Sequence, residues 1–182
     1  MWPDPHEGET IAVAKVKRSR GKSGYVFFKE LGGAPSRAAL SKTARVLIDK
    51  ELLKGRILDY GCGQGFDAAQ LCWDAFDPYY RNSSVTGPYD TIVVNHVANV
   101  LTRGSRTKLF ENVRELLSDG GIAYVSVARN IPVGGKAGAR RRIQNYVVLT
   151  AKSIFADEEE EIYAIPKNYQ FEDSTKEFEE GI

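Results

Sequence analysis

The chain has few of the residues from which disulfide frameworks and metal clusters are built. Its 182 residues include two cysteines, two histidines and one methionine. Cys62 and Cys72 cannot form a metal cluster alone, and so low a cysteine content is typical of a reduced intracellular protein. No uninterrupted apolar stretch approaches the length of a membrane span, and the first residues lack the pattern of a secretory signal. We therefore expect a cytoplasmic protein.

The net charge of +1 hides a strong segregation of charge along the chain. Residues 1–56 carry 12 Lys and Arg against 6 Asp and Glu, and residues 129–152 carry six basic side chains and no acid. Residues 157–182 carry ten acids against two lysines. Two basic regions thus flank a middle part of balanced charge, and an acidic segment follows the second basic region.

The length suits one domain with its own hydrophobic core and leaves little room for a second, large recognition domain. We interpret residues 1–34 as a basic N-terminal extension or lid, residues 35–170 as the main domain, and residues 171–182 as an acidic tail. Recognition of a target would then depend on the ends and loops of the chain.

An apolar strand that ends in an acid and leads into three glycines is the most distinctive pattern. Asp59 closes the strand, and Gly61, Gly63 and Gly65 follow at alternate positions. Such glycines let the backbone turn sharply from strand to helix and approach a ligand closely. In the dinucleotide pattern Gly-x-Gly-x-x-Gly the third glycine falls one residue later, where this chain has Phe66. The motif predicts a bound cofactor that is not selected through a pyrophosphate, which disfavours a nicotinamide enzyme.

The run Asp59-x-Gly61-x-Gly63-x-Gly65 resembles motif I of the class I S-adenosylmethionine-dependent methyltransferases, and Asp77 ends the next apolar stretch. The resemblance implies a Rossmann-like sheet that binds S-adenosylmethionine beside its first strand. It implies that the glycines lie against the cofactor, and that Asp59 orients the loop or holds the methionine ammonium through water. It also implies that the Asp77 carboxylate accepts both ribose hydroxyls. Asp77 precedes a proline, so an ordinary turn residue is the alternative.

A narrower likeness joins several short motifs across residues 10–130. In order along the chain come a basic stretch, a helix, the glycine motif, Asp77-Pro78-Tyr79, Val94-Asn95 and Asn99-Val100-Leu101. This order resembles that of methyltransferase-like proteins associated with DNA phosphorothioation loci. Only these short motifs carry the resemblance, and it implies no particular methyl acceptor.

Strands and helices alternate along the rest of the chain. A helix is expected from Pro35-Ser36 to about Leu53, because its apolar residues recur at helical spacing. The further expected elements are helices over 66–71 and from Ser105 to Asp119-Gly120-Gly121, and strands over 72–76, 90–95, 122–128, 145–149 and 161–166. This alternation predicts a three-layer α/β fold with a mostly parallel sheet, closed by an antiparallel C-terminal edge hairpin.

Two polar residues lie at the end of the strand expected at 90–95, whose continuous β-branched run is typical of a buried strand. Asn95 and His96 lie where methyltransferases of this class place residues that meet the cofactor or the acceptor. His96 is a candidate general base, because a neutral imidazole can take the proton that a methylated oxygen or nitrogen sheds. A packed, hydrogen-bonded histidine is the alternative interpretation. Methyl transfer itself depends mainly on alignment of the reactants.

A glycine-rich basic loop follows the strand expected at 122–128. Its cations are Lys136, Arg140, Arg141 and Arg142, which could bind a phosphate backbone or another anionic substrate. A solvated loop is the alternative. Two functions follow from these patterns: a methyltransferase of unknown acceptor, or a non-catalytic nucleic-acid-binding or accessory protein on a degenerate methyltransferase fold.

Overall fold

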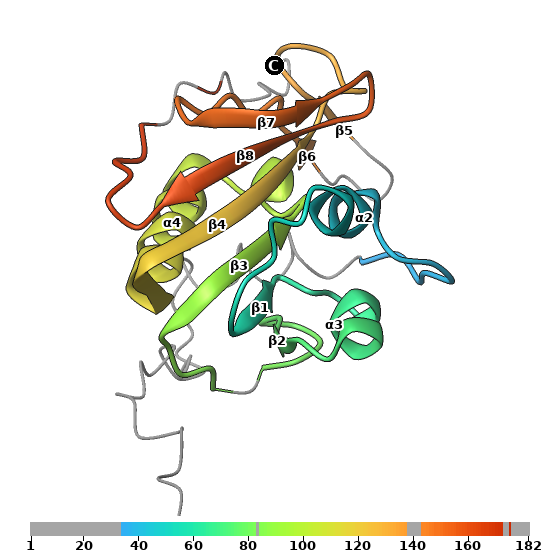
Figure 1. Cartoon of the computed structure of the whole chain (residues 1–182). Helices are drawn as coiled ribbons and strands as arrows, with labels where there is room; N and C mark the ends of the chain where they lie inside the picture. Colours follow the sequence, from blue (N-terminus) through green and yellow to red (C-terminus); the bar gives the residue numbers. More distant parts are fainter. Residues whose placement is uncertain (1–33, 83, 138–142, 173–174, 176–182) are drawn as a thin grey trace, which may run out of the picture.

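The computed structural model describes residues 34–82, 84–137, 143–172 and 175 (Figure 1). Nearly all of the basic extension and most of the acidic tail lie outside these residues, so their proposed boundaries stay predictions. Within the described residues no helix is long and apolar enough to cross a membrane.

The described elements follow the chain from a short helix into an alternation of strands and helices. They are α2 (Lys42–Asp49), β1 (Ile57–Tyr60), α3 (Phe66–Leu71), β2 (Asp74–Phe76), β3 (Tyr89–Asn95), the 3-10 helix η1 (Ala98–Val100), α4 (Arg103–Leu116), β4 (Leu117–Ala128), β5 (Lys136–Ala137), β6 (Ile143–Gln144), β7 (Lys152–Ala156) and β8 (Glu160–Pro166).

Six strands form one sheet in the order β2-β1-β3-β4-β8-β7. The first four strands in this order run parallel to one another, whereas β8 is antiparallel to both β4 and β7. Strands β5 and β6 form a separate antiparallel pair. The predicted fold class, a mostly parallel α/β sheet with an antiparallel C-terminal edge hairpin, is confirmed.

Helices cover both faces of this sheet (Figure 1), and successive residues of β3 belong to the two different apolar clusters that result. Ile92 and Val94 belong to the larger apolar cluster, which also contains the inward residues of α4. Val93, which points the other way, belongs to a second cluster with Leu47 of α2. Successive residues of a strand face opposite sides, so a continuous apolar run such as that of β3 is buried in both layers.

The helix expected from Pro35 begins later, at Lys42. Ser41 is its N-cap, and the Ser41 hydroxyl accepts a hydrogen bond from the Ala44 amide at 3.0 Å. This bond satisfies one of the amides that every helix start leaves without a partner. The residues before Ser41 are therefore free to lie across the carboxyl end of the sheet, and they line the site described below.

Two other expected elements differ from the structure. Helix α4 begins after the N-cap Thr102 rather than at Ser105, and it passes directly into β4, which includes Gly120 and Gly121. Residues 145–149 form no strand. Asn145 is held instead over η1, because its amide donates to the Asn99 carbonyl at 2.7 Å, and β7 provides the edge strand beside β8.

Candidate functional site

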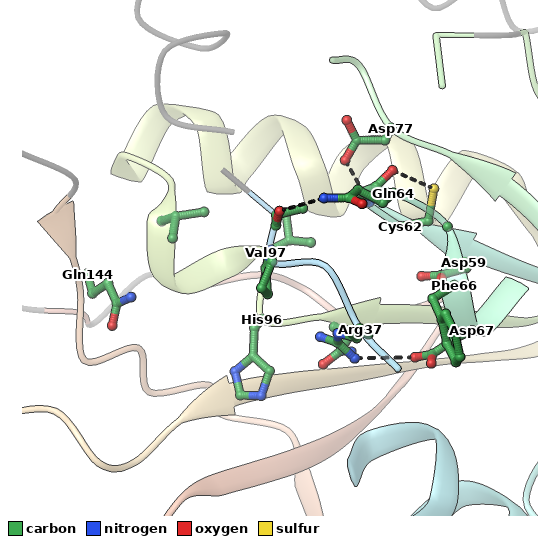
Figure 2. Close-up of a pocket in the computed structure, with 17 residues that line it drawn as sticks. Arg37, Asp59, Cys62, Gln64, Phe66, Asp67, Asp77, His96, Val97 and Gln144 are labelled. Carbon is green, nitrogen blue, oxygen red and sulfur yellow. Dashed lines mark hydrogen bonds and ion pairs between the residues drawn. The ribbon is translucent and has the colours of Figure 1, made fainter. Parts of the chain in front are cut away.

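The site lies where the order of strands reverses. From β1 the chain passes to β2 on one side, and it then returns to β3 and β4 on the other side. Helices and loops leave the sheet in opposite directions at such a point, which opens a crevice outside the carboxyl ends of the strands. A cavity of about 330 Å³ occupies this position (Figure 2). The segment before α2 covers part of it through Ala34, Pro35 and Arg37.

The structure brings the predicted site residues together around this cavity. The lining includes Asp59 and the three glycines after β1, Asp77 after β2, and Asn95 and His96 at the end of β3. In Figure 2, Asp59 and Asp67 lie at one side of the cavity and Gln144 at the other, with His96 between them. Proximity is thus established, and the roles of these residues toward a cofactor stay predictions.

The glycine loop needs glycine for both conformation and space. Gly61 and Gly63 have φ angles of 82° and 56°, in the region that side chains rarely adopt. A Cβ at Gly61 would collide with the Val97 side chain, and one at Gly63 would collide with the Ala34 methyl group. The loop is therefore enclosed on two sides, by the segment before α2 and by the residue that follows His96.

Asp77 is a structural anchor of the loops around the cavity. One carboxylate oxygen accepts the Gly63 amide at 3.0 Å, and the other accepts the amides of Tyr79 and Tyr80 at 2.8 and 2.9 Å. The residue is 3 % exposed. The turn interpretation thus describes two of its three contacts, the third being the bond from the glycine loop, and a carboxylate with four acceptor positions retains capacity for a further donor.

Asp59 lies beside two other acids at the cavity. Burial raises its pKa from 3.8 to about 7, and the neighbouring charges of Asp67 and Asp77 add to the rise. Arg37 opposes this effect, and its guanidinium forms an ion pair with Asp67 at 3.5 Å. The Asp67 carboxylate also accepts the Ser41 amide at 2.9 Å, which fixes the start of α2 against α3. The cavity wall is therefore acidic overall.

Asn95 joins the segment before α2 to the core of the site. In the amide orientation that satisfies all of its neighbours, Asn95 donates to the hydroxyls of Ser126 and Thr43 at 2.9 and 3.0 Å. Its oxygen then accepts from Arg37 at 3.2 and 3.3 Å and from the Ser41 hydroxyl at 3.2 Å. Asn95 is thus a hydrogen-bonded link between three segments as well as a lining residue.

His96 separates the cavity from a second hollow. Its backbone has a φ of 55°, and its amide donates to the Ser126 carbonyl and hydroxyl at 3.2 and 3.1 Å. The second hollow has a volume of about 690 Å³ and shares Arg37, Asn95 and His96 with the first. Its far side includes Glu160 of β8 and Lys136 of β5. Of the four cations of the basic loop, Lys136 is described, whereas Arg140, Arg141 and Arg142 lie outside the described residues.

Glu160, Thr43 and Arg37 are site residues that sequence reasoning missed. Glu160 belongs to a run of acids that has the composition of a solvated segment, yet it is 3 % exposed because it begins β8 on the inward side. Its Oε2 lies 2.9 Å from His96 Nε2 and accepts the Thr43 hydroxyl at 3.4 Å. The strand-like alternation of residues 160–166 was the signal that could have placed Glu160 inward.

Neither a reactive thiol nor a metal centre emerges at this site. The Cys62 thiol faces the cavity, but burial and the charges of Asp59 and Asp77 raise its pKa to about 12, so it stays protonated and weakly nucleophilic. Among the described residues, no group of three or more His, Cys, Asp or Glu side chains is arranged to hold a metal ion.

The solved structures that this chain is similar to include S-adenosylmethionine-dependent methyltransferases. One is a TehB-like enzyme of that class from Corynebacterium glutamicum, with 21 % identity over 69 % of this chain and 87 % of that chain, and a TM-score of 0.46. Another is the glycopeptide N-methyltransferase MtfA in complex with S-adenosylmethionine, with 17 % identity over 69 % and 70 % and a TM-score of 0.40. A Pyrococcus horikoshii protein has 12 % identity over 69 % and 88 %, and a TM-score of 0.48.

No protein-family model and no curated protein matches the chain. The similarities to solved structures concern the course of the backbone, and the chemistry of this chain depends on its own side chains. The narrower resemblance to proteins of phosphorothioation loci stays a prediction.

Proposed function

We propose that this chain is an S-adenosylmethionine-dependent methyltransferase. The observation that carries the proposal is the acidic, glycine-lined cavity at the reversal point of the sheet. S-Adenosylmethionine has a positive sulfonium and a positive ammonium group, and the buried carboxylates of Asp59, Asp67 and Asp77 give this cavity a complementary charge. A volume of about 330 Å³ is within the range of small-molecule sites.

The residues around the cavity fit such a ligand. Gly61 and Gly63 let Val97 and Ala34 pack closely against the loop, and an adenosyl group would lie beside the cavity wall that they form at the end of β1. Asp59 would accept the ammonium, and Asp77 would accept a ribose hydroxyl through its remaining capacity. When bound, S-adenosylmethionine supplies a methyl group on a sulfonium leaving group. The protein then has to align an acceptor in the second hollow, which meets the cavity at Asn95 and His96.

Calorimetric titration with S-adenosylhomocysteine tests this proposal. We expect saturable binding to the full chain. Gly63→Arg should lose at least tenfold in affinity, because it places a large side chain in the wall of the cavity, where even a Cβ would collide with Ala34. Gly104→Ala is the matched control, because a Cβ at Gly104 meets nothing within 4 Å and the residue lies in α4. Both variants are first checked for folding by circular dichroism. No binding by the wild-type protein would contradict the proposal.

The second candidate is a non-catalytic nucleic-acid-binding or accessory protein. It is favoured by one observation, that Asp77 already accepts three backbone amides and is therefore largely committed to structure. In this case Lys136, Arg140, Arg141 and Arg142 would bind phosphates, and affinity would fall steeply with salt. DNA or RNA binding with that salt dependence, together with no uptake of S-adenosylhomocysteine, would support this function over the first.

A further inference from the structure

We propose that Glu160 is a positioning residue that makes His96 the proton acceptor for a methyl acceptor carrying an N–H or O–H group. This inference rests on the proposed methyltransferase function and adds a substrate class to it. An acceptor that has no proton to lose, such as a thioether or a tertiary amine, needs no base, and a site built for such an acceptor has no use for the pair.

The geometry of the pair fixes which nitrogen of His96 is available. Glu160 Oε2 lies 2.9 Å from His96 Nε2, and the carboxylate side chain is 4 % exposed whereas the imidazole side chain is 35 % exposed. A carboxylate only accepts hydrogen bonds, so Nε2 carries the hydrogen. Nδ1 of the neutral ring then holds a lone pair. Because His96 lines both the cavity and the second hollow, this ring lies where a methyl donor and an acceptor would meet.

The surroundings of Glu160 leave its negative charge to His96. Its Oε1 is buried and has no hydrogen-bond partner among the described residues. Two nearby cations have other partners, since Lys42 pairs with Asp157 and Glu159, and Arg129 pairs with Glu161. Buried charges are normally paired, so the positive charge that forms on the His96 ring when it accepts a proton would be stabilised by Glu160.

The turn between β7 and β8 holds Glu160 in this position. Asp157 accepts the backbone amides of Glu159 and Glu160 at 2.9 and 3.0 Å. The neighbouring side chains consequently point in opposite directions: the Glu159 side chain is 68 % exposed, and that of Glu160 is buried. The Thr43 hydroxyl, which also bonds to Asn95, holds Glu160 from the side of α2.

The proton balance of the reaction gives this pair its role. The acceptor nitrogen or oxygen forms a bond to the methyl carbon, and the bond from that carbon to sulfur breaks with its electron pair left on sulfur. The acceptor's proton passes to His96 Nδ1, and the imidazolium that results donates through Nε2–H to Glu160. A carboxylate that orients an imidazole and stabilises its charged form is an established device in proton transfer.

Other charged groups face the same two hollows, so comparison of variants is more informative than one pH profile. They are Arg37, Lys42, Lys136 and Glu159 around the second hollow, and Asp59, Asp67 and Asp77 around the cavity. Among these, Glu159 offers a matched control. Glu159→Gln removes the same charge one residue from Glu160 without touching His96.

Nuclear magnetic resonance of the two histidine rings tests the inference in the full chain. A His96→Gln sample identifies the signals of His96, since the only other histidine is His6. We expect the Nε2–H form of neutral His96, and a proton affinity at least tenfold lower in Glu160→Gln than in the wild type. Glu159→Gln should change it less than threefold, and Glu160→Asp should recover part of the loss.

An Nδ1–H ring in the wild type, or equal effects of the two glutamine variants, would overturn the inference. Should Glu160→Gln fail to fold, Thr43→Val is measured in its place, because this variant removes the hydroxyl that holds Glu160. An unchanged His96 proton affinity in folded Thr43→Val would also overturn the inference.

S-Adenosylhomocysteine titration of the same samples separates the two proposals. Normal binding in Glu160→Gln with altered His96 titration supports both, whereas normal binding with unaltered titration refutes only the role of Glu160. No binding by the wild type refutes the methyltransferase function instead.

Discussion

Replacement of Asp59 by asparagine should stabilise the protein at neutral and alkaline pH. In the folded state burial and the charges of Asp67 and Asp77 raise the pKa of Asp59 to about 7 from an ordinary value of 3.8. An acid with a raised pKa binds its proton more tightly when folded. Its contribution to stability is therefore fully present below about pH 4 and is lost as the pH rises through 7. Asparagine has nearly the same shape and carries no such charge.

The size of this effect follows from the pKa difference. A shift of roughly three units corresponds to at most about 4 kcal/mol, at about 1.36 kcal/mol per unit. Asp59→Asn should thus gain up to that amount relative to the wild type between pH 4 and pH 8. Urea unfolding at both pH values measures the gain. The exposed Asp49 provides the control Asp49→Asn, in which the pH dependence of unfolding should match the wild type.

The same substitution tests the charge argument for the cofactor. A cation that binds beside Asp59 lowers its pKa. Asp59 with a pKa of about 7 is about half protonated at pH 7, so binding of S-adenosylmethionine should release up to about half a proton per ligand from the wild type and none from Asp59→Asn. Calorimetry in two buffers with different ionisation enthalpies counts the protons. Two results would refute the reasoning: a variant no more stable than the wild type at pH 8, or equal proton release from both proteins.

Four further substitutions have expected outcomes in urea unfolding. Gly63→Ala should cost about 2 kcal/mol, since the residue has a positive φ and a Cβ would strike Ala34, while Gly104→Ala in α4 should gain about 0.5 to 1 kcal/mol; equal effects would contradict the close packing of the loop. Asp77→Ala should cost about 3 kcal/mol, because three amides lose their acceptor, and a loss of S-adenosylhomocysteine affinity at unchanged stability would instead favour a purely ligand-binding role. Arg106→Ala should cost about 3 kcal/mol or more, since the fully buried guanidinium donates to the Leu101 carbonyl, and a cost below about 1 kcal/mol would show that this bond contributes little.

The sheet and the glycine loop were predictable because their signals are local. A β-branched run such as that of β3 fits only a strand buried on both faces, and the glycine spacing fits only a tight turn after β1. These two signals also predicted that Asp59, Asn95 and His96 would meet, because carboxyl ends of parallel strands share one edge of a sheet.

The remaining parts of the site depend on contacts between segments distant in sequence. Residues 34–40 precede the N-cap Ser41, and they lie beside the glycine loop through contacts with residues distant in sequence, such as the bond from Gln64 Nε2 to the Ala34 carbonyl at 3.2 Å. Glu160 reads as one more acid in a run of acids, and only its register in β8 turns it inward. The segment 145–149 has the alternation of a strand, but its amide at Asn145 finds a partner in η1, so β7 takes the edge position instead.

The edge position of β2 has a consequence for local motion. This strand of three residues is bonded to the sheet on one side only, whereas β4 has a strand on each side. Hydrogen exchange should consequently be much faster in β2 than in β4. Because Asp77 follows β2 and holds the Gly63 amide, detachment of this edge would open the cavity at Gly63 and Asp77 while the rest of the domain stayed folded. A ligand bound there would slow exchange at this edge first, and its affinity would include the free energy needed to keep the edge closed.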